Sequence, residues 1–188
     1  MTVLSAQSIQ LRINPKEGMQ YSEGKVVHVW AENRLEIEPF EPEAKQVFGM
    51  SYGLTAAGYD IRLGQIRHPR RGNEIVETCT LRPGEFLLAA SFERVKIPND
   101  LQVIVHDKSS WARKGLALQN TVLEPGWEGY ITLELSNHGD KTIALHKGQP
   151  IAQLVFHQLD QPTTIPYDGK YQNQSAAPQE SIYQEDRL

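Results

Sequence analysis

The chain has 188 residues, enough for one compact domain with a sizeable core, and its net charge of −4 gives no support to nucleic-acid or membrane-surface binding. No apolar run approaches the roughly 20 residues of a membrane span, and the N-terminal residues lack the basic segment and long apolar core of a signal peptide. A single cysteine, Cys79, excludes an internal disulfide framework, so we expect a cytoplasmic globular protein.

The N-terminal quarter predicts a short helix followed by short strands. Ser5 is a good N-cap for a helix over Ala6–Arg12, which Asn14–Pro15 ends. Val26–Trp30 has the composition of a short strand. Leu35–Phe40 alternates apolar and acidic residues, as expected of a half-buried strand stopped by proline.

The next stretch predicts a turn and an exposed hairpin. Gly58 precedes a strand and marks a turn or a close approach of two backbones. Residues 65–78 are polar and predict an exposed hairpin or loop, in which Arg67, Arg70 and Arg71 are solvated rather than functional.

From Thr80 onward, strand patterns recur every 8–12 residues, separated by proline, glycine, asparagine and aspartate. The predicted strands cover Leu81–Ala89 after its turn, Phe92–Ile97, Leu101–Val105, Leu116–Val122, Tyr130–Asn137, Thr142–Leu145 and Pro150–Phe156. This spacing predicts an all-β barrel or sandwich with only minor helix.

Residues 106–137 concentrate the chemistry. Phosphate-binding donors in this stretch are followed closely by acids on apolar strands, which suggests a site that grips an anionic ligand and performs acid–base chemistry on it. One cysteine cannot supply the ligands of a zinc deaminase, and the six histidines show no HxxxH or HExxH spacing. The sequence therefore predicts no zinc site.

Five segments, in order, resemble the dUTPase-like superfamily and, more closely, its dCTP deaminase branch. They are Ala57–Arg62 (AGYDIR), Lys108–Arg113 (KSSWAR), Leu123–Gly129 (LEPGWEG), Thr132–Asn137 (TLELSN) and Gly169–Gln174 (GKYQNQ). The resemblance covers residues 1–174 as one domain and leaves 175–188 as a polar, mobile tail without an assigned role.

The resemblance implies a distorted β-barrel or jelly-roll protomer in a homotrimer, with active sites between subunits. The implied reaction is dCTP + water → dUTP + ammonia without zinc, with Mg²⁺ carried by the substrate triphosphate. A C-terminal segment is expected to close over the nucleotide, and dTTP is a possible feedback inhibitor. No nucleic acid or membrane partner is implied.

Glu134 matches the catalytic glutamate of the family. One carboxylate can activate water and then protonate the departing amine if burial raises its pKa toward neutrality. By alternation alone, Glu134 is more simply a solvent-facing strand residue, because Thr132, Glu134 and Ser136 share one face. The family match favours the catalytic role.

Ser109, Ser110 and Arg113 match the motif that binds phosphate and the attacking water, and we assign catalytic roles to Ser109 and Arg113. Without the resemblance, the same pattern is an N-capped turn. Lys108 stands where the family has arginine or lysine and is expected to bind substrate. Asp107 replaces the usual glycine and places an acid beside this motif.

Other substrate contacts also follow from the resemblance. Asn120, Thr121 and Val122 present backbone groups to the base. Glu124 replaces the aspartate of dUTPases and is expected to contact the deoxyribose, while Trp127 packs under the sugar or belongs simply to the core. Residues assigned to the triphosphate and the remaining substrate contacts are Tyr167, Lys170, Gln174 and Gln153.

Two alternatives remain open on the same fold. The chain is a dUTP pyrophosphatase or a bifunctional enzyme, or else a non-catalytic trimeric nucleotide-binding regulator. Glu124 in place of aspartate argues against the first, because a shift near 1 Å costs about 100-fold when attack geometry is strict. The presence of Glu134, Lys170 and Gln174 argues against the second.

Overall fold

The computed structural model describes residues 2–14, 34–72 and 74–183. Strands dominate it and are, in chain order, β1 (Thr2–Val3), β2 (Glu36–Glu38), β3 (Lys45–Val47), β4 (Met50–Thr55), β5 (Gly58–Arg67), β6 (Ile75–Val76), β7 (Thr78–Leu81), β8 (Phe86–Lys96), β9 (Leu101–Asp107), β10 (Leu116–Leu118), β11 (Val122–Leu123), β12 (Glu128–Asn137), β13 (Ile143–His146) and β14 (Pro150–Gln158). The described helices are α1 (Ala6–Ile13) and α2 (Ser109–Ala112). The prediction of a β-rich fold with minor helix is confirmed.

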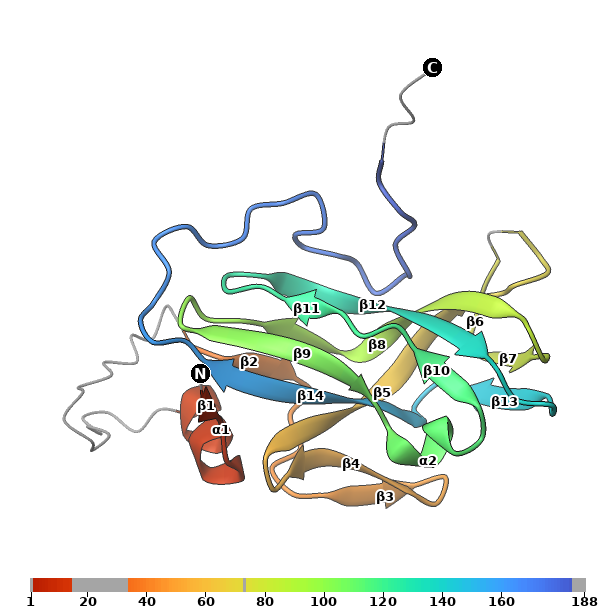
Figure 1. Cartoon of the computed structure of the whole chain (residues 1–188), viewed down its shortest axis with the longest axis horizontal. Coiled ribbons are helices and arrows are strands. Elements are labelled where there is room, and N and C mark those ends of the chain that lie inside the picture. Colours follow the sequence, from red (N-terminus) through yellow and green to blue (C-terminus); the bar gives the residue numbers. More distant parts are fainter. Residues whose placement is uncertain (1, 15–33, 73, 184–188) are drawn as a thin grey trace.

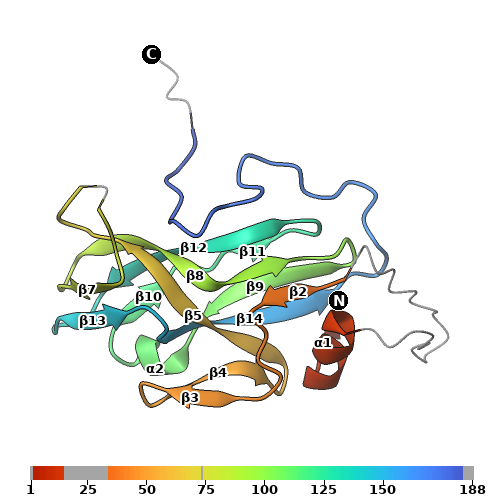
Figure 2. The same cartoon turned by 180° about the vertical axis from the view of Figure 1, so that it is seen from behind.

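The main sheet is antiparallel and curls round on itself (Figures 1 and 2). Its strand order is β10-β12-β8-β5-β14-β9-β11, with β1, β2, β4 and β6 attached along this path and β3 attached to β4. The two ends of the path, β10 and β11, are joined by residues 119–121 alone. Such a short connection between the ends requires a curled, barrel-like sheet, as the sequence predicted. A small second sheet pairs β7 with β13.

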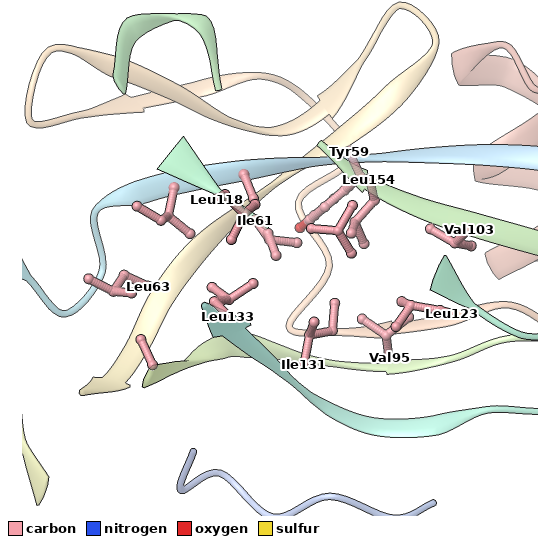
Figure 3. Packing of buried hydrophobic residues seen from close by; sticks show 14 of the residues in the cluster. Tyr59, Ile61, Leu63, Val95, Val103, Leu118, Leu123, Ile131, Leu133 and Leu154 are labelled. Carbon is pink, nitrogen blue, oxygen red and sulfur yellow. The ribbon is translucent and has the colours of Figure 1, made fainter. Parts of the chain in front are cut away.

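The inward-facing side chains of this curled sheet form one apolar core (Figure 3). Alternation along β12 shows how the strands build it: Ile131, Leu133 and Leu135 are buried, while the residues between them face the other side. Tyr59 and Ile61 on β5 meet these side chains from the opposite part of the sheet (Figure 3). Within the described residues, no helix is long and apolar enough to cross a bilayer.

Three local predictions in the first half of the chain can be compared with the structure. Ser5 caps α1 by accepting a hydrogen bond from the Ser8 backbone N–H, as predicted. A Cβ on Gly58 would lie 2.6 Å from the Leu154 carbonyl oxygen, which confirms the close approach of β5 and β14. The strand predicted at Val26–Trp30 lies outside the described residues.

Two strand boundaries were predicted wrongly. The separate strands ending at Ala89 and starting at Phe92 are one strand, β8, because no turn residue interrupts them. The single strand predicted over Leu116–Val122 is two, β10 and β11. Residues 119–121 leave β12 and join β9: the Gln119 N–H donates to the Glu134 carbonyl at 3.0 Å, and the Thr121 carbonyl accepts from Val105 at 3.0 Å.

The arginine cluster is less solvated than the sequence suggested. The Arg70 guanidinium pairs with Glu85 and donates to the Thr80 carbonyl at 3.2 Å. Arg67 donates to the Pro178 carbonyl at 3.0 Å, which ties the β5–β6 hairpin to the C-terminal segment. Polar composition alone did not reveal these partners, since they lie elsewhere in the chain.

Candidate active site

A cavity of about 500 Å³ is lined by residues of β11, β12 and the C-terminal segment. The C-terminal segment runs past β11 and β12 (Figure 1). This volume is in the range of small-molecule sites. The residues that line it come from four separate parts of the chain and are Phe86, Leu88, Thr121, Val122, Leu123, Glu124, Trp127, Ile131, Thr132, Glu134, Tyr167, Tyr171, Gln174, Gln179, Glu180 and Ser181. Seven predicted site residues are therefore brought together: Thr121, Val122, Glu124, Trp127, Glu134, Tyr167 and Gln174.

Glu134 lies on β12 opposite Leu88 of β8 and faces this cavity. Its sequence neighbours Leu133 and Leu135 are fully buried in the core, so the strand holds the carboxylate on the opposite face. The side chain is half-buried, and this desolvation raises the pKa of Glu134. Among the described residues no ion pair of Glu134 counteracts the shift. A raised pKa makes a carboxylate a stronger base, which suits it to accept a proton in acid–base chemistry.

The segment before Glu124 forms one wall of the cavity. Thr121 and Val122 lie in the crossover from β10 to β11 and line the cavity, whereas Asn120 is exposed and does not. Glu124 is exposed to the cavity side and also lines it. Trp127 is 4% exposed in the core and also lines the cavity, and its packing under the sugar stays a prediction.

The C-terminal segment forms the opposite wall. The Gln174 backbone carbonyl accepts from Tyr130 at 3.0 Å, and its side-chain oxygen accepts from the Thr132 hydroxyl at 2.6 Å. The Trp127 indole donates to the Tyr171 carbonyl at 2.9 Å. The Lys170 ammonium lies outside the cavity lining and contacts the Ile182 carbonyl. These contacts dock residues 167–174 against β12.

Three residues beyond Gln174 were missed by sequence reasoning. Gln179, Glu180 and Ser181 line the cavity. The Gln179 N–H donates to the Thr132 hydroxyl at 3.0 Å, and Glu180 forms an ion pair with Arg67 at 3.3 Å. No motif in the polar tail signals this placement. The division of the chain at residue 174 stays a prediction.

The phosphate motif lies apart from this cavity. Ser109, Ser110 and Arg113 are exposed on and beside α2, and none of them lines the cavity. In both Figures 1 and 2 the strands separate α2 from the C-terminal segment. Lys108 and Gln153 are placed differently again, in a buried polar cluster around Asp60. A single chain thus presents the two halves of the predicted site on different surfaces.

A family model described as dCTP deaminase-like matches residues 20–159 of this chain. The chain belongs to the dCTP deaminase-like family. It is 35% identical over 158 residues to a dCTP deaminase of Acidobacterium capsulatum, covering 73% of this chain and 86% of that protein. It is also 33% identical over 180 residues to a dCTP deaminase of an Acidovorax species, covering 83% and 96% of the two chains.

A solved structure also shares the fold of this dCTP deaminase-like chain. The crystal structure of 2′-deoxycytidine 5′-triphosphate deaminase from Agrobacterium tumefaciens superposes with a TM-score of 0.55 at 17% identity. The match covers 83% of this chain and 47% of that chain, so this chain spans about half the length of that protein. At this identity the likeness concerns the fold alone.

Asp107 shows how this dCTP deaminase-like chain accommodates its departure from the expected glycine. The Asp107 carboxylate accepts a hydrogen bond from the Leu118 backbone N–H at 2.7 Å. The acid therefore fastens the end of β9 to β10.

Among the described residues, no group of three or more histidine, cysteine, aspartate or glutamate side chains gathers as a metal-binding cluster. The buried thiol of Cys79 lies on β7, and burial raises its pKa.

Proposed function

We propose that this protein deaminates dCTP to dUTP and ammonia, with Glu134 as general base and then general acid. The observation that carries the proposal is the placement of Glu134, half-buried in a cavity of nucleoside size with its pKa raised by desolvation. Membership of the dCTP deaminase-like family supplies the substrate class. The single cysteine suits a reducing compartment, so we place the reaction in the cytoplasm.

The proposed chemistry needs one carboxylate used twice. Glu134 takes a proton from water, and the resulting hydroxide attacks C4 of cytosine while the C4=N3 electron pair moves to N3. The tetrahedral intermediate then expels the exocyclic amine as ammonia, and its oxygen becomes the C4 carbonyl. The proton held by Glu134 and the remaining hydroxyl proton end on N3 and on ammonia, which balances dCTP + H₂O → dUTP + NH₃.

The raised pKa of Glu134 is what lets one group perform both transfers. A carboxylate of ordinary pKa is a weak base toward water and returns its proton poorly near neutral pH. Burial of the Glu134 side chain disfavours its charged form and brings its proton affinity closer to the working pH.

We propose further that the site is completed between protomers of a homotrimer. Ser109, Ser110 and Arg113 are exposed on one surface, and the Glu134 cavity opens on another. A neighbouring protomer can therefore supply the hydroxyls and the guanidinium that suit phosphate oxygens. The substrate enters as a triphosphate carrying Mg²⁺, and Lys170 and Gln174 of the docked C-terminal segment complete its binding.

Product analysis tests the reaction. The protein is incubated with dCTP, dCMP and dUTP in the presence of Mg²⁺, and ammonia, pyrophosphate and nucleotides are quantified. Ammonia and dUTP from dCTP are expected, with little pyrophosphate from dUTP because Glu124 stands in place of aspartate. Pyrophosphate release without ammonia would refute the deaminase and favour a dUTP pyrophosphatase, and binding without turnover would favour a regulator. Addition of dTTP tests feedback inhibition in the same assay.

Mixing of inactive variants tests the shared site. Glu134→Gln and Arg113→Ala are each expected to be inactive, but subunits exchanged between them should form some sites with both wild-type residues and regain activity. Mixing Ser109→Ala with Arg113→Ala is the matched control, since both changes lie on the α2 side and no intact site can form. Failure of the first mixture to recover activity after verified subunit exchange would contradict a site between protomers.

A further inference from the structure

A buried ion pair lies at the point where the C-terminal segment leaves the sheet. The Arg12 guanidinium, in the last turn of α1, donates to the Asp100 carboxylate at 2.6 Å and also contacts the Gln158 side-chain oxygen. The Gln158 amide donates to the carboxylate and to the carbonyl of Asp100, each at 3.1 Å. Gln158 ends β14, and α1 lies beside this end of the strand (Figures 1 and 2). Three side chains therefore join α1, the β8–β9 turn and the start of the C-terminal segment.

Both charges of this pair are largely removed from water. The side chain of Arg12 is 10% exposed and that of Asp100 is 5% exposed. The second Asp100 oxygen is buried and has no hydrogen-bond partner among the described residues. Neutralising the carboxylate would therefore leave an uncompensated buried guanidinium. Neither Arg12 nor Asp100 lines the Glu134 cavity, so the pair can act on a bound nucleotide only through the residues that it holds.

The β8–β9 turn carries the first residues of the C-terminal segment. The Asp100 carbonyl accepts from the Leu159 N–H at 2.9 Å, and the Asn99 carbonyl accepts from the Thr163 N–H, also at 2.9 Å. These are backbone contacts, so the place of residues 159–163 depends on the place of the turn. The place of the turn depends in part on the Asp100 side chain, which ties it to α1 and β14.

The same turn is hydrogen-bonded to one wall of the cavity. The Ile97 N–H donates to the Trp127 carbonyl at 2.8 Å, and the Ile97 carbonyl accepts from the Gly126 N–H at 3.0 Å. The Tyr167 N–H donates to the Pro125 carbonyl at 2.8 Å. Both Trp127 and Tyr167 line the cavity. A continuous set of contacts therefore runs from the ion pair, through residues 97–100 and 125–127, to a cavity residue of the C-terminal segment.

We infer that Arg12 and Asp100 are positioning residues: their buried ion pair fixes the turn that carries residues 159–167, and so holds Tyr167 at the cavity. Neither side chain touches the substrate. The N-terminal helix thereby takes part in building a wall of the site that is formed by the other end of the chain. The inference rests on the proposed function, because the wall matters through the nucleotide that it encloses.

A pair that only stabilises α1 on the sheet would behave differently from a positioning pair. Asp100→Asn breaks the pair with little change of size. Glu93→Gln is the matched control, because it makes the same carboxylate-to-amide change at the buried Arg62–Glu93 pair, which joins β5 to β8. Both variants should lose stability, with melting temperatures lowered by about 10 °C. Only Asp100→Asn should disturb the C-terminal segment.

The experiment compares wild type and both variants at a temperature where all are folded. Hydrogen exchange of the amides in residues 159–167 should be about tenfold faster in Asp100→Asn and unchanged in Glu93→Gln. The KM for dCTP and the dissociation constant from calorimetry with Mg²⁺ should both rise about tenfold in Asp100→Asn, because the wall must then be ordered on binding. The kcat should stay within about twofold of wild type, since Glu134 is not displaced.

Two further variants sharpen the test. Tyr167→Ala should weaken dCTP binding by itself, and adding Asp100→Asn to it should cost little more, because the pair acts through this residue. Gln158→Leu keeps the ion pair and removes only the amide that ties Asp100 to the end of β14. It should raise the KM about threefold with a smaller loss of melting temperature, and it serves in place of Asp100→Asn if that variant does not fold.

The outcomes separate this inference from the proposed function. Unchanged hydrogen exchange in residues 159–167, or equal losses of dCTP affinity in Asp100→Asn and Glu93→Gln, would reduce the pair to a stabilising contact and overturn the inference. Affinity losses that multiply in Tyr167→Ala/Asp100→Asn would overturn it as well. Wild-type protein that binds dCTP without releasing ammonia would refute deamination and leave these comparisons interpretable, since hydrogen exchange needs no substrate and calorimetry needs no turnover.

Discussion

Replacing Glu134 by glutamine tests the proposed chemistry most directly. The amide keeps the size of the side chain and loses the ability to accept a proton from water. Glu134 lies on a strand fixed by fully buried leucines on either side, so the substitution should leave β12 and the cavity in place. We expect this variant to lose turnover and to keep its ability to bind dCTP.

The size of the effect follows from the role of the group. Removing a general acid or base costs about 10²–10⁴-fold in rate, or about 2.7–5.5 kcal/mol of activation free energy. The upper end is expected because the same carboxylate serves both proton transfers. Ammonia release at saturating dCTP measures the rate, and calorimetry measures the dCTP affinity, which should stay within about threefold because Glu134 is not placed against the triphosphate.

Glu128→Gln provides a matched control. It makes the same chemical change on the same strand, but the Glu128 carboxylate pairs with Arg94 and lies 4.0 Å from Lys96, outside the cavity lining. Deamination should persist in this variant. Retained turnover in Glu134→Gln, or equal loss in both variants, would remove Glu134 from the mechanism.

The stability of Glu134→Gln should also differ from wild type in a defined pH range. The pKa of Glu134 is raised in the folded protein, so protonation favours folding. That contribution is present below the ordinary glutamate pKa and is lost as pH rises through the raised folded value. At neutral pH the glutamine variant should therefore melt at the same temperature as wild type or higher. Thermal melts between about pH 4 and pH 7 would contradict this if the variant lost more stability than wild type as pH rose.

Three further predictions concern other parts of the molecule. Glu93→Ala leaves the Arg62 guanidinium, 13% exposed, without its carboxylate partner at 2.7 Å, and should lower the free energy of unfolding by about 3–5 kcal/mol in urea titrations; a loss below about 1 kcal/mol would refute this. Gly129→Ala would place a Cβ 2.6 Å from the Gln174 nitrogen at a φ of +147°, and should weaken dCTP binding about tenfold in calorimetry. Asp107→Gly removes the acceptor of a β10 N–H and should lower the melting temperature by about 2–4 °C, and an unchanged value would contradict the bridging role.

The fold was predictable wherever one face of a strand meets the core. The alternation in Tyr130–Asn137 predicted β12 because every second residue had to be apolar, and the structure buries those residues. The break between β10 and β11 was not predictable from the same rule. Residues 119–121 change hydrogen-bonding partners from β12 to β9, and nothing in their own sequence indicates which strand they will pair with.

The candidate site was predictable where its residues lie together in one local sequence motif. The motif around Glu134 and the segment before Trp127 belong to one cavity, as the resemblance implied. The pairing of Lys108 with Asp60 joins residues 48 positions apart, and the lining role of Gln179 depends on how the tail crosses β12. Such contacts arise from the tertiary fold, so no local pattern indicates them.

Asp60 and Glu134 are two shielded carboxylates of this chain, and their surroundings distinguish a structural carboxylate from a catalytic one. Asp60 has an ammonium, a hydroxyl and an amide on its two oxygens, so its charge is held by donors of the protein. Glu134 has apolar neighbours on β12 and β8 and no ion-pair partner among the described residues, and its pKa is raised. A shielded carboxylate without such compensation costs stability, and a cavity is where that cost serves proton transfer. If Asp60 were the catalytic base and Glu134 a structural residue, Asp60→Asn would stop ammonia release with dCTP binding intact, and Glu134→Gln would loosen the fold. We expect instead that Asp60→Asn loosens the fold and that Glu134→Gln stops ammonia release with dCTP binding intact.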